Sequence, residues 1–201
     1  YLGHPIMDSI ENFKKKNIGK YFFKINKIDD KKKIIAILPG SRKQEIKKIL
    51  NIMLGVVEYF PEYQFVIAGA PNIEKSFYSD LVKYSDVKVV ENQTYNLLSN
   101  SEAALVTSGT ATLETALFNI PQVVCYKTSY ISYFLAKIFI KIKFISLVNL
   151  IVNKEIIREL IQNECCKSNI ISELRRILNK ENSNSMKKNY GKLISLIGSS
   201  G

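Results

Sequence analysis

A repeated alternation between short apolar runs and longer segments with helical periodicity constrains the fold of this chain more than any other feature. From residue 34 onward, each apolar run leads through a turn into a stretch whose apolar side chains are three and four residues apart. Repeated units of this kind indicate a parallel sheet with helices on both faces. We expect strands at residues 34–38, 63–68, 87–90, 103–106 and 122–126.

The helices follow from the same periodicity. The clearest apolar face begins after residue 42 and carries Ile46, Ile49, Leu50, Met53, Val57 and Phe60. Other helices are expected at 73–84, 95–98, 110–118, 130–143, 155–162, 168–179 and 183–197, with an extended piece at 145–149. The predicted fold class is therefore α/β, a Rossmann-like parallel sheet flanked by helices with its ligand at the carboxyl ends of the strands.

The length of 201 residues suits a single hydrophobic core, and we expect the chain to divide into three segments. Residues 1–30 are predicted to form an interdomain connection and entry helix, residues 31–165 the Rossmann-like domain, and residues 166–201 terminal helices. The opening residues lack the charged and apolar regions of a signal peptide, and they read as the middle of a longer protein.

The charge of the chain favours an anionic partner without identifying it. Lysine and arginine number 29 against 18 acidic residues, which gives a formal net charge of +11. A membrane surface or a phosphorylated ligand suits this charge, but with few arginines and no recognisable motif we expect no nucleic-acid partner. Three cysteines without disulfide or metal-ligand spacing favour a reducing, cytoplasmic location.

The first loop at the predicted ligand edge is Pro39-Gly40-Ser41-Arg42, which connects a strand to a helix. The N–H groups and positive end of such a helix favour an anion, and the Arg42 guanidinium suits phosphate oxygens. We predict that Ser41 and Arg42 bind substrate. A structural alternative, compatible with that role, has Ser41 capping the helix and Glu45 closing a capping box.

The second loop consists of small residues, several with hydroxyls, at another junction between a strand and a helix. Its predicted substrate-binding residues are Ser108, Gly109, Thr110, Ala111 and Thr112. A phosphate could approach the backbone closely here because no bulky side chain intervenes. Neither loop matches a Walker loop or a dinucleotide fingerprint, which argues against a nucleotide triphosphatase and against NAD binding.

Glu114 lies on the helix after the second loop, on the same face as residues 110 and 111. Its side chain should lean toward the helix N-terminus, where a carboxylate would accept hydrogen bonds from ribose hydroxyls. The alternative is a glutamate that only stabilises the helix dipole. The local sequence does not decide between these two roles.

The remaining candidates favour structure over chemistry. His4, the only histidine, lies beside a proline, and Asp29 and Asp30 precede three lysines, so we expect no metal and no cofactor. Lysines interrupt the apolar stretch 130–152, which is therefore too short in uncharged residues to cross a membrane. It is either a buried helix and strand or a basic, apolar surface that lies on an anionic bilayer.

Several motifs, in this order and spacing, make the chain resemble the lipid-A-disaccharide synthases. They are Gly3-His4-Pro5, Leu38-Pro39-Gly40-Ser41-Arg42 with Glu45, Ser108-Gly109-Thr110-Ala111-Thr112-Leu113-Glu114, residues 123–127, and Ser146-Leu147-Val148-Asn149-Leu150 with Glu159-Leu160-Ile161-Gln162. The resemblance covers nearly the whole chain. Val148 and Arg158 depart from it, since proline is often found at these positions in the family.

The resemblance implies the C-terminal, sugar-donor half of a two-domain, inverting GT-B glycosyltransferase. Residues 31–165 would bind UDP-2,3-diacylglucosamine, and an N-terminal domain outside this sequence would hold the acceptor, lipid X. Transfer would form lipid A disaccharide 1-phosphate and UDP in lipid A biosynthesis. The general base is expected in that N-terminal domain, so we expect no catalytic residue here, an inactive fragment, and a cytoplasmic place at the inner face of the inner membrane.

Residue by residue, the resemblance puts Ser41 and Arg42 in the first nucleotide loop and residues 108–112 in the phosphate loop. It puts Glu114 at the ribose and Asn149 in a segment on the sugar-donor side. Two other functions stay open. One is a different GT-B enzyme that uses UDP-GlcNAc, such as a peptidoglycan transferase or a 2-epimerase, and the other is a non-catalytic basic module at a membrane surface.

Overall fold

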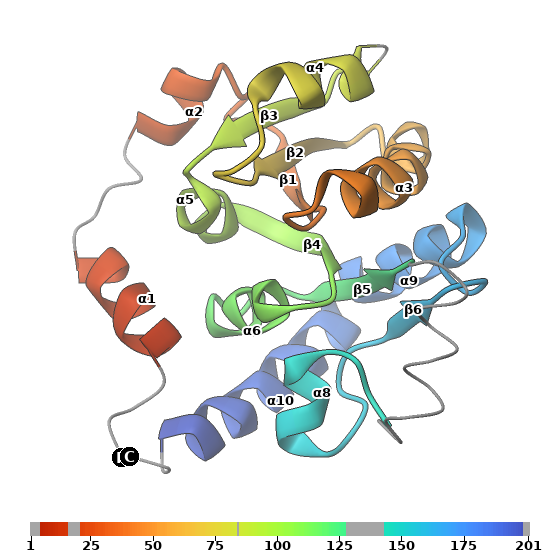
Figure 1. Cartoon of the computed structure of the whole chain (residues 1–201). Helices are drawn as coiled ribbons and strands as arrows, with labels where there is room; N and C mark the ends of the chain where they lie inside the picture. The colour runs from red at the N-terminus through yellow and green to blue at the C-terminus, as the bar shows by residue number, and fades with distance from the viewer. Residues whose placement is uncertain (1–4, 16–20, 84, 128–142, 199–201) are drawn as a thin grey trace.

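A computed structural model shows an α/β fold built on one parallel sheet (Figure 1). The structure describes residues 5–15, 21–83, 85–127 and 143–198. Within these residues six strands form a single sheet in the order β3-β2-β1-β4-β5-β6, and every neighbouring pair is parallel. The predicted fold class is confirmed.

The strands coincide with the apolar runs of the sequence. Their bounds are β1 (Lys33–Leu38), β2 (Tyr63–Gly69), β3 (Lys88–Glu91), β4 (Ser101–Thr107), β5 (Gln122–Tyr126) and β6 (Glu159–Ile161). The first five agree with their predicted positions to within two residues, because β1, β2, β4 and β5 are apolar runs that are mostly buried, and β3 has an apolar centre at Val89 and Val90.

The helices also follow the predicted periodicity in most of the chain. Their bounds are α1 (Pro5–Lys15), α2 (Phe22–Asn26), α3 (Lys43–Leu54), α4 (Lys75–Val82), α5 (Thr94–Ser99), α6 (Thr110–Leu117), α8 (Leu147–Val152), α9 (Lys167–Leu178) and α10 (Lys180–Gly198). The helix expected to continue to Phe60 ends earlier, and a 3-10 turn, η2 (Val57–Tyr59), follows it.

Alternate strand side chains enter two apolar clusters, one on each face of the sheet. Ile35 and Ile37 of β1 pack in the larger cluster with side chains of α3 and α9, whereas Ile34 and Ala36 pack in the smaller one with side chains of α2 and α5. In Figure 1, α5 lies on the left of the strands and α3 on the right. Helices thus cover both faces of the sheet, and because all its strands are parallel, their carboxyl ends lie at one edge.

Two predicted elements near the end of the sheet are wrong. Residues 145–149 were expected to be extended, but α8 occupies residues 147–152, and the Ser146 hydroxyl caps it by accepting a hydrogen bond from the Asn149 N–H. Residues 155–162 were expected to be helical, but they contain β6, which pairs with β5. β6 depends on its pairing with β5, and α8 begins at the Ser146 cap; the apolar pattern of the sequence shows neither contact.

The helix predicted at 130–143 and His4 lie outside the described residues. The terminal helices α9 and α10 share the larger apolar cluster with the sheet, through Leu174, Ile177, Tyr190 and Leu193. The division into three segments stays a prediction. No helix in the described part of the chain is long and apolar enough to cross a membrane.

Candidate functional site

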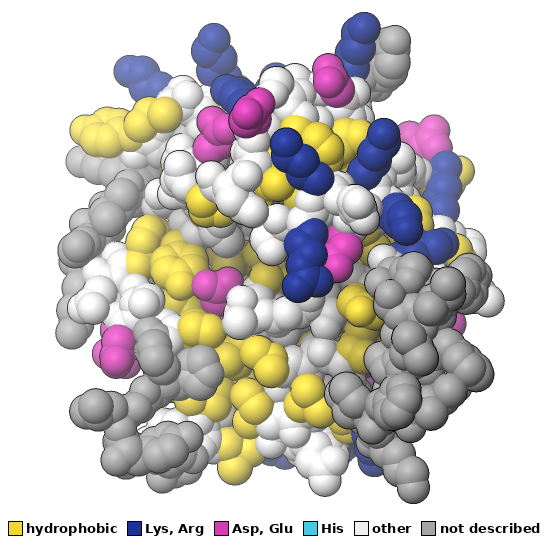
Figure 2. Space-filling view, viewed as in Figure 1, with side chains coloured by type: hydrophobic (Ala, Val, Ile, Leu, Met, Phe, Trp, Pro, Cys, Tyr) yellow, Lys and Arg dark blue, Asp and Glu magenta, His cyan; other side chains and the backbone are white. Residues whose placement is uncertain are grey.

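A pocket of about 550 Å³ lies at the carboxyl ends of the central strands. It is lined by Leu38, Pro39, Gly40, Ser41, Arg42, Glu45, Ala68, Gly69, Ala70, Pro71, Thr94, Tyr95, Thr107, Ser108, Gly109, Thr110, Ala111 and Glu114. The two predicted loops thus both line one pocket. On the face shown in Figure 2, lysine and arginine side chains gather mostly in the upper part and apolar side chains mostly in the lower part.

The loop after β1 carries the positive side chain of the pocket. Arg42, not Ser41, is the N-cap residue of α3, and no side chain caps this helix, so the predicted capping box of Ser41 and Glu45 is wrong. Glu45 instead pairs with Arg42, with 3.1 Å between Oε1 and Nη1. The Arg42 side chain is 79% exposed, so it is free to exchange this weak surface pair for a ligand.

The loop after β4 presents open backbone to the pocket. Gly109 precedes α6 with φ +149°, and a Cβ atom at this position would have nothing within 4 Å. No side chain caps α6. The Ser108 hydroxyl donates a hydrogen bond of 2.7 Å to the Ile145 carbonyl, which ties this loop to the segment before α8.

Together the two loops bring the N-termini of α3 and α6 to one pocket. The first turns of α3 and α6 have N–H groups without intrahelical acceptors, and neither helix uses a side-chain cap to satisfy them. The loops approach each other closely, since a Cβ on Gly40 would lie 3.6 Å from the Thr107 Cγ2. Two positive helix ends thus face the same pocket, and a ligand with two phosphates matches them.

Glu114 is held at the pocket by a tyrosine of the neighbouring helix. The Tyr95 hydroxyl, from α5, donates a hydrogen bond of 2.9 Å to Glu114 Oε1. Burial, and next the nearby Glu114 carboxylate, raise the pKa of Tyr95 to about 12, so the hydroxyl stays protonated at neutral pH. The Tyr95 ring also packs with those of Phe13 and Phe118. Glu114 therefore has a fixed oxygen, and its carboxylate can still accept hydrogen bonds from a ligand.

A second hollow of about 320 Å³ adjoins the pocket. The two share Pro71, Thr94 and Tyr95, and the second is completed by Phe13, Asn92, Gln93 and Asn96. The side-chain oxygen of Asn96 is buried and has no hydrogen-bond partner within the described residues. A polar, partly aromatic hollow of this kind suits a flat, hydrogen-bonding group.

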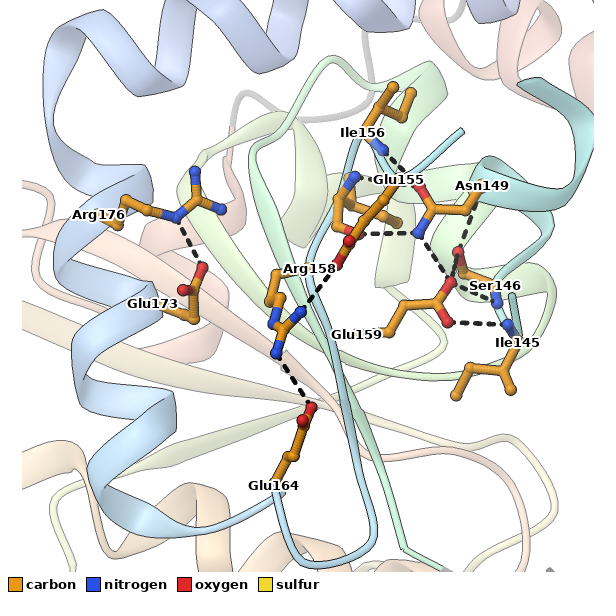
Figure 3. Close-up of polar contacts among 11 residues, drawn as sticks. Ile145, Ser146, Asn149, Glu155, Ile156, Arg158, Glu159, Glu164, Glu173 and Arg176 are labelled. Carbon is orange, nitrogen blue, oxygen red and sulfur yellow. Dashed lines mark hydrogen bonds and ion pairs between the residues drawn. The ribbon is translucent and has the colours of Figure 1, made fainter. Parts of the chain in front are cut away.

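Two predicted site residues, Thr112 and Asn149, do not line the pocket. Thr112 is fully buried in α6, and its hydroxyl donates a hydrogen bond of 2.8 Å to the Gly109 carbonyl. Asn149 lies in α8. It is fully buried, and its amide makes four hydrogen bonds, from the Ile156 and Ile157 N–H groups and to the Ile157 carbonyl and Glu159 Oε1 (Figure 3). These contacts use all the hydrogen-bonding capacity of the amide. Asn149 holds the turn between α8 and β6.

Sequence reasoning missed Thr94 and Tyr95, which line the pocket from the start of α5. A signal for them was present, because the loop after every strand of a parallel sheet reaches the same edge. Among the described residues, no group of three or more histidine, cysteine, aspartate or glutamate side chains could hold a metal ion.

Solved structures with the same fold include a UDP co-structure of S. aureus MnaA, with a TM-score of 0.64 and 15% sequence identity. That match covers 96% of this chain and 50% of the other. A UDP-GlcNAc 2-epimerase of Neisseria meningitidis bound to UDP-GlcNAc has a TM-score of 0.58 at 21% identity, over 98% of this chain and 52% of the other. The lipopolysaccharide glycosyltransferase WaaG has a TM-score of 0.51 at 15% identity, over 92% and 50%. These matches confirm the fold as one half of the GT-B architecture.

Sequence similarity identifies the family of this chain more narrowly than the fold does. A lipid-A-disaccharide synthase of Persephonella marina is 39% identical over 181 residues, which cover 82% of this chain and 45% of that protein. A synthase of Colwellia psychrerythraea is 34% identical over 191 residues, 91% of this chain and 48% of that protein. The chain thus spans about half the length of the curated relatives it matches. The sequence model of the lipid-A-disaccharide synthetase family matches residues 1–198, and the chain belongs to that family.

Proposed function

We propose that this chain is the sugar-donor-binding half of an inverting glycosyltransferase that joins UDP-2,3-diacylglucosamine to lipid X. The products are lipid A disaccharide 1-phosphate and UDP. One observation carries the proposal: in a member of this family, Arg42 and Glu114 line one pocket between two uncapped helix ends. The acceptor domain and the general base belong to the rest of the protein.

The binding mode follows from the charges around the pocket. The diphosphate lies against the first turns of α3 and α6, where N–H groups and helix dipoles favour negative charge. Glu114 accepts hydrogen bonds from the ribose hydroxyls, and its contact with Tyr95 fixes its orientation. The base enters the adjoining hollow, whose lining includes the side-chain amides of Asn92, Gln93 and Asn96.

The same groups assist the chemical step. When the bond between the sugar and UDP breaks, negative charge builds on the diphosphate, and oriented donors stabilise it without reorganising. Arg42 and the two helix ends supply those donors. Closure of the acceptor domain over the pocket aligns the nucleophile and excludes water that would hydrolyse the sugar donor.

A calorimetric titration of this chain with UDP, against ADP and CDP as controls, tests the proposal. UDP should bind with micromolar affinity and raise the melting temperature, since a ligand that binds only the native state stabilises it. Equal and weak binding of all three nucleotides would contradict it. A competition experiment with acylated and plain UDP-GlcNAc separates this function from that of a 2-epimerase. The proposed glycosyltransferase should bind the acylated sugar more tightly, and a 2-epimerase should not.

We also propose that the chain acts at the cytoplasmic face of the inner membrane. Leu150 and Ile151 of α8 are 41% and 38% exposed, and Lys154 is exposed at the end of the same helix. Apolar side chains beside a lysine suit an anionic bilayer. Flotation with vesicles that contain phosphatidylglycerol should recover the chain, and Leu150→Ser with Ile151→Ser should reduce that recovery. Equal recovery with neutral vesicles would contradict the electrostatic part.

A further inference from the structure

We propose that the buried carboxylate of Glu159 is a positioning residue for the Ser108-Gly109 turn, and through it for the phosphates of the ligand. The inference rests on the proposed function, because it concerns the same diphosphate site. It assigns Glu159, Ser146 and Asn149 a common role, although none of the three lines the pocket.

Glu159 lies in β6 and is only 6% exposed, yet its carboxylate is surrounded by neutral hydrogen-bond donors. Its Oε2 accepts from the Ile145 N–H at 2.8 Å. Its Oε1 accepts from the Ser146 N–H at 3.0 Å, from the Ser146 hydroxyl at 2.6 Å and from the Asn149 amide at 2.8 Å. Hydrogen bonds to a carboxylate are stronger than neutral ones, so Glu159 fixes the backbone of residues 145 and 146.

The fixed backbone leads directly to the pocket. Ile145 gives its N–H to Glu159 and accepts the Ser108 hydroxyl with its carbonyl, at 2.7 Å. Ser108 lines the pocket, and Gly109 follows it with open space above its backbone. A continuous path of hydrogen bonds therefore connects a buried carboxylate in β6 to the loop that faces the ligand.

The site requires a carboxylate because both oxygens are used. A glutamine has one acceptor oxygen, and its NH₂ group would face a donor, either the Ile145 N–H or the donors at Oε1. Burying a charge is costly unless hydrogen bonds compensate it, and the four donors around the Glu159 carboxylate supply that compensation. Two neighbours differ clearly, because Glu155 and Glu164 are about half exposed and pair with Arg158 at the surface (Figure 3).

The test compares Glu159→Gln with Glu164→Gln as its matched control. Hydrogen exchange of the ligand-free chain should show faster exchange of the amides at residues 108–110 and 145–147 in Glu159→Gln, with unchanged exchange in β1 and β2. UDP affinity should fall about 10-fold, the size of one hydrogen bond to a charged group. Glu164→Gln should keep its affinity within about twofold, as expected of a surface ion pair.

A double-variant cycle separates positioning from general destabilisation. Ser108→Ala removes the other end of the same path, so the pair Glu159→Gln with Ser108→Ala should bind UDP no more weakly than the worse single variant. Fully additive losses, or exchange at residues 108–110 equal to that of the parent chain, would overturn the inference. If Glu159→Gln does not fold, Ser146→Ala removes one donor and should show the same pattern at smaller size. Failure of the parent chain to bind UDP would refute the proposed function. Hydrogen exchange of the ligand-free chain would still test whether Glu159 positions the Ser108-Gly109 turn.

Discussion

The two loops that enclose the pocket differ in how the protein holds them. The loop after β1 ends in Arg42, whose side chain is 79% exposed and forms an ion pair with Glu45 at the surface. The loop after β4 has no charged side chain between Thr107 and Ala111, and Ser108 anchors it to the network around Glu159. One loop contributes an exposed charge and the other a fixed backbone. Loss of the Arg42 side chain should therefore weaken ligand binding without unfolding the chain, whereas loss of the Ser108 anchor should change the shape of the second loop.

The largest expected effect is that of Asn149→Ala, which breaks the fixed side. It leaves the partly buried N–H of Ile156 and the buried N–H of Ile157 without acceptors, so we expect a loss of about 3 kcal/mol in the free energy of unfolding. Urea denaturation measures this loss. Asn51→Ala, at an exposed position of α3, is the control and should change stability by less than about 0.5 kcal/mol. Equal effects of the two changes would show that the Asn149 contacts contribute little.

Gly109→Ala should be next in size. A residue with a side chain is strained at φ +149°, which costs about 2 kcal/mol, and the new methyl group would project into the space beside the α6 N-terminus. Both stability and UDP affinity should fall. Gly191→Ala in α10 is the matched change, also into open space, and should stabilise the helix by up to about 1 kcal/mol. A Gly109→Ala protein that binds UDP normally would argue against close approach of a phosphate.

Arg42→Ala tests the other side of the comparison. UDP affinity should fall roughly 10-fold, whereas the free energy of unfolding should change by less than about 0.5 kcal/mol, because the pair with Glu45 is at the surface. Titration calorimetry and urea denaturation measure the two quantities. Arg158→Ala, which also removes an arginine from surface ion pairs, should leave UDP affinity unchanged. Unchanged UDP affinity in Arg42→Ala would remove Arg42 from the site.

Tyr95→Phe should have the smallest effect, about 1 kcal/mol in stability from the lost hydrogen bond to Glu114. Since the pKa of Tyr95 is raised to about 12, its contribution is complete below the unfolded value near 10 and is lost as pH rises through about 12. The stability difference between the parent chain and Tyr95→Phe should therefore shrink between pH 10 and 12. Tyr21→Phe, at an exposed tyrosine, should show no such trend.

Much of the fold could be predicted from the sequence, because β1, β2, β4 and β5 are apolar runs whose side chains are mostly buried. β6 could not, since a three-residue strand that begins with a glutamate has little intrinsic strand preference. Its place depends on pairing with β5 and on the hydrogen bonds that Glu159 accepts from residues 145–149. α8 was also predicted wrongly, because its leucine, valine and isoleucine residues are typical of a strand. The sequence pattern does not show the Ser146 cap at which the helix begins.

The candidate site was predictable where it depends on loops after strands. Ser41, Arg42, residues 108–111 and Glu114 meet at one pocket because parallel strands end at the same edge. The sequence could not place Asn149, whose four hydrogen bonds are within its own turn. The roles of the pocket residues toward a ligand remain predictions that the variants above can test.

The strand order has a consequence for folding. β1 and β4 are neighbours in the sheet, although β2 and β3 separate them along the chain. Contacts between such distant segments form slowly, because the intervening chain must first lose its freedom. A chain in which only β1, β2 and β3 have assembled would have the pocket loop after β1 in place but not the pocket loop after β4. The proposed nucleotide site is therefore complete only in molecules in which β1 and β4 have paired.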